Sequence, residues 1–140
     1  MSNSWICVDA SLVVRLVADP ADVSVHGLWE QWSAENQRIA APTLLFYEVT
    51  NALYQYERHG LLTPGSVQLA QGAALELPID LYGGVTLHRR ALELAQRFSL
   101  PATYDAHYLA VAEELEAELW TVDRRLVGAL SGSLPWVRQV

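Results

Sequence analysis

The sequence predicts an α/β fold: a three-layer α/β/α sandwich around a central, mostly parallel sheet of four to five strands. Short apolar runs alternate with longer helical patterns along all 140 residues. Such alternation is typical of βαβ units, whose crossover helices cover both faces of a parallel sheet. Single cores commonly extend to roughly 150 residues, so residues 1–140 are expected to form one domain.

Apolar runs bounded by turn signals predict the buried strands. These runs lie at residues 5–9, 38–42, 77–81 and 118–123, with 135–140 as the optional fifth strand.

Helical periodicity fills the segments between the strands. Asp19-Pro20 stops the first helix, Thr43 is the expected N-cap of the third, and Thr63-Pro64 supplies the N-cap and first residue of the fourth. The predicted helices cover 9–18, 23–35, 44–58, 64–75, 86–98, 104–116 and a last segment from Asp123 to before Gly128 or Gly132.

The charged residues exclude several chemistries. Nine basic residues face sixteen acidic ones, for a net charge of −7, and all nine are arginines. Without lysine there is no Walker A phosphate loop and no Schiff-base amine. The acidic balance argues against strong nonspecific nucleic-acid binding. Any phosphate chemistry must therefore use arginine, backbone groups or a metal ion.

The composition also favours a cytoplasmic protein. The single Cys7 cannot form an intramolecular disulfide and fits a reducing compartment. The first residues have no positively charged region and Asp9 interrupts their apolar stretch, unlike a signal peptide. No apolar run approaches the ~18 residues of a membrane span, so no membrane association is expected.

Three aspartates are expected at one edge of the sheet. Asp9 ends the first predicted strand, Asp123 ends the fourth, and Asp105 opens the helix 104–116. Parallel sheets bind ligands beyond the carboxyl ends of their strands. The alternative is that each aspartate only caps a helix N-terminus, which stabilises by about 0.3–2 kcal/mol.

Glu48 is a charge within an apolar helix face. In the helix 44–58 it borders the stripe that includes Leu45 and Val49. A carboxylate there must be paired or coordinate something. It could form a buried pair with an arginine such as Arg15, or it could point into a pocket shared with the aspartates.

Carboxylates that converge in one pocket repel one another and remain ionised together only when a cation holds them. Oxygen ligands without histidine or cysteine select hard ions such as Mg²⁺ or Mn²⁺, which keep water ligands and act on phosphates. The candidate catalytic and metal-binding residues are Asp9, Glu48, Asp105 and Asp123.

An ordered set of motifs extends over the chain. VDAS at 8–11 places an Asp after the first strand, and PTLLFYEVTNAL at 42–53 contains E-x-x-N in a helix. TYDAHYLAVAEELEAELWTVDRRL at 103–126 contains Y-D-A-x-Y-L-A and T-x-D-x-x-L. This set resembles the PIN domain and, more narrowly, VapC-type toxins, the ribonuclease halves of type II toxin–antitoxin pairs.

The resemblance implies a PIN-like fold, with residues 1–140 as a single PIN domain. It implies that the four carboxylates bind one or two Mg²⁺ or Mn²⁺ ions and that the protein hydrolyses RNA. Ser11, Asn51 and Thr121 match polar positions flanking the family's site. The resemblance also implies a cognate antitoxin, whose C-terminal segment binds around the helices 23–35 and 44–58, and a homodimer.

Two arginines are candidates for RNA contact. Arg15 follows Asp9 by one to two helical turns, and Arg124 directly follows Asp123. A planar guanidinium can grip phosphate. The alternative for each arginine is a solvated helix face or an ion pair with a neighbouring carboxylate.

The histidines are not expected to bind metal. His26, His59 and His88 have no ligand spacing with one another, and His107 points to a different helix face from Asp105.

The leading functional hypothesis is a metal-dependent endoribonuclease toxin. One alternative is a PIN nuclease without a toxin role, acting on structured DNA or in RNA maturation. Another is a non-catalytic PIN-like binding module, against which the complete set of four carboxylates argues.

Overall fold

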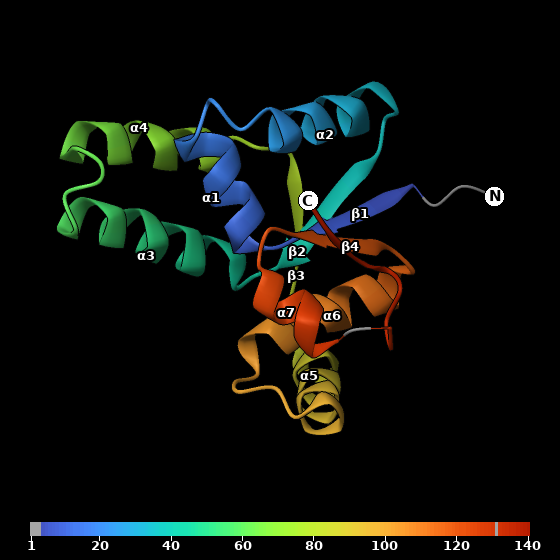
Figure 1. Ribbon diagram of the computed structural model, residues 1–140. Coiled ribbons are helices and arrows are strands. Elements are labelled where there is room, and N and C mark those ends of the chain that lie inside the picture. The colour runs from blue at the N-terminus through green and yellow to red at the C-terminus, as the bar shows by residue number, and fades with distance from the viewer. Residues whose placement is uncertain (1–3, 131) are drawn as a thin grey trace.

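A parallel sheet forms the centre of the molecule (Figure 1). The computed structural model describes residues 4–130 and 132–140. Within them the sheet has five strands in the order β3-β2-β1-β4-β5, and every neighbouring pair is parallel. The strands are β1 (Trp5–Val8), β2 (Arg38–Pro42), β3 (Ile79–Tyr82), β4 (Glu118–Thr121) and β5 (Val137–Gln139).

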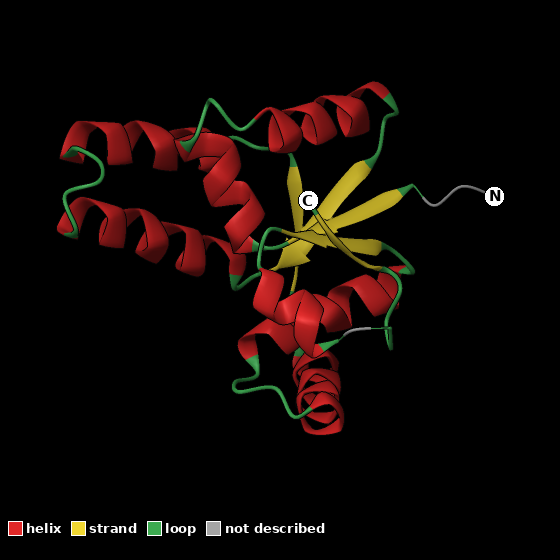
Figure 2. Ribbon diagram, in the orientation of Figure 1, coloured by secondary structure: helices red, strands yellow, loops and turns green. Residues whose placement is uncertain are grey.

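Helices cover both faces of the sheet (Figure 2). The helices α1 to α4 lie on one side and α5 to α7 on the other, as right-handed crossovers in this strand order require. Their bounds are α1 (Ala10–Ala18), α2 (Val23–Ala34), α3 (Leu45–Arg58), α4 (Pro64–Leu75), α5 (Val85–Phe98), α6 (Tyr104–Leu115) and α7 (Arg124–Ala129). The predicted three-layer α/β/α sandwich is confirmed.

The register of the two central strands positions the polar residues that follow them. β1 is buried from Ile6 to Val8, as expected for a strand covered on both faces. Val8 lies opposite Trp120 in β4. The next residues, Asp9 and Thr121, therefore reach the carboxyl edge of the sheet side by side.

The predicted elements differ from the observed ones only at their ends. Asp9 and Asp123 were included in strands but are the N-caps of α1 and α7. The N-cap of α3 is Leu44 rather than Thr43, and no side chain caps that helix. α7 contains Gly128 and ends before Gly132.

No helix in the described ranges combines the length and apolar character needed to cross a membrane.

Candidate active site

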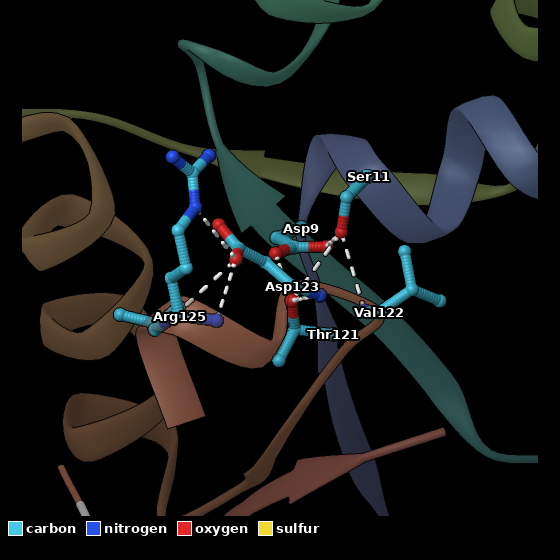
Figure 3. A network of polar contacts seen from close by, with 7 residues as sticks. Asp9, Ser11, Thr121, Val122, Asp123 and Arg125 are labelled. Atoms are coloured by element: carbon cyan, nitrogen blue, oxygen red, sulfur yellow. Dashed lines mark hydrogen bonds and ion pairs between the residues drawn. The ribbon is translucent and has the colours of Figure 1, made fainter. Parts of the chain in front are cut away.

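Asp9 is the most buried of the four carboxylates. It is 6% exposed and follows β1 directly. Both of its oxygens accept hydrogen bonds: Oδ1 from the Ser11 hydroxyl (2.7 Å) and the Leu12 amide (3.1 Å), and Oδ2 from the Thr121 hydroxyl (2.5 Å). Figure 3 shows Ser11 and Thr121 beside the Asp9 carboxylate. The predicted helix cap is real, and hydroxyl groups from two segments hold the same side chain.

The surroundings of Asp9 make its negative charge unfavourable without a cation. Burial raises the pKa of Asp9 from 3.8 to about 6, although the bonds from Thr121, Ser11 and Leu12 oppose the rise. The charge of Asp105 adds to the rise. A cation bound beside Asp9 would stabilise the charged form of this carboxylate.

The Thr121 side chain links Asp123 to Asp9. The Thr121 hydroxyl accepts a hydrogen bond from the Asp123 amide (2.9 Å) while donating to Asp9. The Asp123 carboxylate caps α7, with Oδ1 accepting from the amides of Arg125 (2.9 Å) and Leu126 (3.4 Å). The guanidinium of Arg125 lies 3.8 Å from the same oxygen (Figure 3).

Glu48 projects from α3 and is held by a tyrosine of α6. The buried Tyr108 donates its hydroxyl to Glu48 Oε1 at 2.6 Å. Burial raises the pKa of Glu48, the Tyr108 bond lowers it, and the charge of Asp105 raises it again. The alternative pairing with Arg15 is wrong, because Arg15 bonds Asp22 at 2.9 Å.

Asp105 is the common neighbour of the other three carboxylates. It raises the pKa of both Asp9 and Glu48, and Asp123 in turn raises the pKa of Asp105 after the larger effect of burial. It does not cap α6, whose N-cap is Thr103. In the described part of the chain, this half-buried carboxylate has no hydrogen-bond partner. Its oxygens are therefore available to a ligand.

The donor set fits a hard cation. The four side chains offer carboxylate oxygens and no sulfur or imidazole nitrogen, which suits Mg²⁺ or Mn²⁺. Over residues 4–130 and 132–140, no three acidic, histidine or cysteine side chains already form a group that could hold an ion. Hydrogen bonds from Ser11, Thr121 and Tyr108 hold Asp9 and Glu48 in these positions.

The supporting polar residues divide into two groups. Ser11 and Thr121 both contact Asp9, and their hydroxyls lie 3.3 Å apart. Asn51 is exposed on α3 and accepts a bond from Gln55 (3.3 Å). It has no contact with the carboxylates in the described ranges, because it lies on the solvent side of the helix.

The two RNA-contact candidates lie on either side of one small cavity. Arg15 and Arg124 both line a space of about 190 Å³, together with Asp22 and Ser24. Arg15 is ion-paired with Asp22, which is the alternative to RNA contact that the sequence left open. Arg124 is exposed and forms no ion pair in the part of the chain that the structure describes.

Sequence reasoning missed two residues of the site. Tyr108 belongs to the Y-D-A-x-Y-L-A motif, but its bond spans 60 residues and joins two helices that cover opposite faces of the sheet. Arg125, rather than Arg124, is the arginine that contacts a site carboxylate.

Comparisons with known proteins place the chain in a family. No protein-family model matches it. It is 30% identical over 126 residues to Ribonuclease VapC3 of Pyrobaculum aerophilum, a match covering 86% of this chain and 91% of that protein. The crystal structure of PAE2754 from P. aerophilum has a TM-score of 0.70 at 24% identity, covering 97% of this chain and 88% of the other. A toxin–antitoxin complex from Klebsiella pneumoniae has a TM-score of 0.60 at 15% identity, with coverage of 96% and 95%. The structural likenesses concern the fold, and the sequence relationship extends over most of both proteins: the chain belongs to the VapC family of ribonucleases.

Proposed function

We propose that this chain is a Mg²⁺- or Mn²⁺-dependent endoribonuclease and the toxin of a type II toxin–antitoxin pair. The observation that carries the proposal is the convergence of acidic side chains at the carboxyl edge of the sheet, where the Thr121 hydroxyl links Asp9 to Asp123. Asp105 has no hydrogen-bond partner in the described residues, and its charge raises the pKa of Asp9 and Glu48. Membership of the VapC family supports the same activity.

Asp9 and Asp105 would be the main ligands of the ion, with Glu48 and Asp123 completing the pocket. A bound Mg²⁺ or Mn²⁺ supplies a Lewis acid that activates water and stabilises charge on the phosphodiester oxygens.

The protein's own groups orient two of these carboxylates, Asp9 and Glu48. Ser11 and Thr121 orient the two oxygens of Asp9, and Tyr108 orients Glu48. Preorganised groups of this kind lose little freedom when the substrate arrives. Arg124 lies next to Asp123 and is the cation proposed to contact RNA phosphate.

The proposed protein partner is a cognate antitoxin. α3 exposes Tyr47 (79%) and Tyr54 (52%), which line a cavity of about 450 Å³ with Phe46. Exposed tyrosines are typical of protein interfaces. The antitoxin is proposed to bind there, and the toxin is proposed to act as a homodimer.

The nuclease proposal is tested by comparing two carboxylates of α6. Asp105→Asn should reduce Mn²⁺-dependent cleavage of single-stranded RNA by about a hundredfold or more, since losing a second-shell partner alone costs 10–100-fold. Glu114→Gln is the control, because Glu114 is exposed on the same helix and has no recorded contact with the site. Cleavage by Asp105→Asn at the parent rate would rule out the assignment.

The toxin role needs a separate test in cells. Expression of the parent chain should arrest growth, Asp105→Asn should not, and co-expression of the cognate antitoxin should restore growth. Growth unaffected by an active nuclease would contradict the toxin role while leaving the ribonuclease assignment intact.

A further inference from the structure

A pair of histidines lies between α5 and α6, outside the four-carboxylate site. His88 is exposed on α5, and His107 is partly exposed on α6. The two helices pack against each other. His88 Nδ1 and His107 Nε2 are 2.9 Å apart, and the rings meet edge to face with centroids 5.0 Å apart. Two metal-ligating side chains thus converge at a position open to solvent.

The backbone determines which nitrogen of His107 is free to bind a metal. His107 Nδ1 lies 2.7 Å from the Thr103 carbonyl oxygen, which can only accept a hydrogen bond. Nδ1 therefore carries the proton, and the lone pair on Nε2 accepts a hydrogen bond from the N–H at His88 Nδ1. A histidine that binds a metal usually donates its other ring N–H to a carbonyl or carboxylate in this way.

The separation of the two nitrogens matches two ligands of one ion. Zn–N bonds of ≈ 2.0–2.1 Å at angles between square and tetrahedral place neighbouring nitrogens about 2.9–3.4 Å apart. The observed 2.9 Å lies at the short end of this span. An ion bound here would replace the hydrogen bond between the two rings, with His88 carrying its proton on Nε2 instead of Nδ1, a tautomer open to any neutral imidazole.

We propose that His88 and His107 form a binding site for a divalent transition-metal ion of the Zn²⁺, Ni²⁺ and Cu²⁺ class. Imidazole nitrogens suit these ions, whereas the carboxylates nearby suit Mg²⁺ and Mn²⁺. In the described ranges no third acidic, histidine or cysteine side chain forms a group with the pair. Water completes the coordination on the solvent side.

The position of this site ties it to the proposed nuclease. His107 directly precedes Tyr108 on α6, and the Tyr108 hydroxyl bonds Glu48 Oε1 at 2.6 Å. A dication on the histidine pair would repel a second cation bound near Glu48. Occupation of the pair should therefore inhibit metal-dependent cleavage, a consequence that rests on the proposed function, whereas the binding itself does not.

Calorimetric titration with Ni²⁺ on the full chain, without RNA or Mg²⁺, tests the binding. His88→Asn should weaken Ni²⁺ binding by at least about tenfold, because even a second-shell loss costs 10–100-fold. His59→Asn, which removes an exposed histidine at the end of α3, should leave binding unchanged. Asp9→Asn should also keep it, because the carboxylates are not the ligands. Equal affinity in the parent and His88→Asn would overturn the proposal, and circular dichroism checks that each variant is folded.

A cleavage assay tests the link to the nuclease. With Mg²⁺ in excess, Ni²⁺ should inhibit the parent, and His88→Asn should need at least about ten times more Ni²⁺ for the same inhibition. Equal inhibition of the two proteins would overturn the inhibitory role. Absence of any cleavage with Mg²⁺ would instead count against the proposed function. The calorimetric test of Ni²⁺ binding does not depend on that outcome.

Discussion

At the scale of single residues, Asp9 has two opposed roles. Its hydrogen bonds to Ser11, Leu12 and Thr121 stabilise the fold locally, while its buried charge destabilises it. The charge would be compensated by a bound cation. The same negative charge therefore lowers stability when no cation is bound and favours the binding of a cation.

The first prediction concerns the pH dependence of folding stability without metal. Asp9 keeps its proton in the native state up to a pKa of about 6, against 3.8 ordinarily. Its ionisation therefore costs nothing below pH 3.8 and reaches its full cost, about 3 kcal/mol, above pH 6. Between these values stability falls as pH rises. Asp9→Asn should lack this component and be the more stable protein at pH 7.

Urea unfolding at several pH values, in buffer with EDTA, measures this difference. The gap between the parent and Asp9→Asn should be small near pH 4 and widen towards pH 7. A gap that does not change with pH would show that the native pKa of Asp9 is not raised.

The second prediction concerns Tyr108. Tyr108→Phe removes the only hydrogen bond to the Glu48 carboxylate in the described residues and should cost about 1.5–3 kcal/mol of stability. Because Glu48 then loses its orientation, RNA cleavage should fall about 10–100-fold. Tyr104→Phe, at an exposed position of the same helix, is the control. Unchanged cleavage by a folded Tyr108→Phe would exclude a positioning role.

At the scale of elements, the sheet and its edge follow from local patterns. Short runs rich in apolar residues predict β1 and β4, and the parallel topology then places Asp9 and Asp123 at one edge. These are short-range signals joined by one topological rule, and so the sequence alone predicts them.

Contacts between helices were harder to predict. The Glu48–Tyr108 bond joins helices on opposite faces of the sheet, and the His88–His107 pair depends on how α6 packs against α5. Periodicity specifies neither arrangement. The resemblance matches Asn51 to a polar position flanking the site, yet in the structure Asn51 is exposed on α3 and bonds Gln55. Sequence separations of 60 and 19 residues leave no local pattern for such pairs.

The third prediction separates the two roles of Asp123 at the start of α7. Asp123→Asn keeps an oxygen that can cap the helix, whereas Asp123→Ala removes the cap and should cost about 1 kcal/mol more stability. Both variants should lose RNA cleavage, because both remove the negative charge. Thermal unfolding and a cleavage assay measure the two effects. Full activity of Asp123→Asn would mean that Asp123 serves only as a cap.

At the scale of the whole molecule, the charge distribution explains an acidic protein in a ribonuclease family. Four of the sixteen acidic residues belong to the candidate site, where a cation would offset them. Five arginines are ion-paired with acidic neighbours in the described ranges: Arg15, Arg38, Arg90, Arg125 and Arg138. Binding of RNA should therefore depend on the bound metal more than on the general surface charge.

The most direct test of the central claim is Mn²⁺ binding measured through thermal stability. The parent should unfold at a higher temperature with Mn²⁺, gaining about 2.7 kcal/mol when the free ion reaches a hundred times its dissociation constant. Asp105→Asn should lose most of that gain, and His88→Asn should keep it. No rise at millimolar Mn²⁺, or an equal rise in Asp105→Asn, would contradict a metal site built from Asp9, Glu48, Asp105 and Asp123.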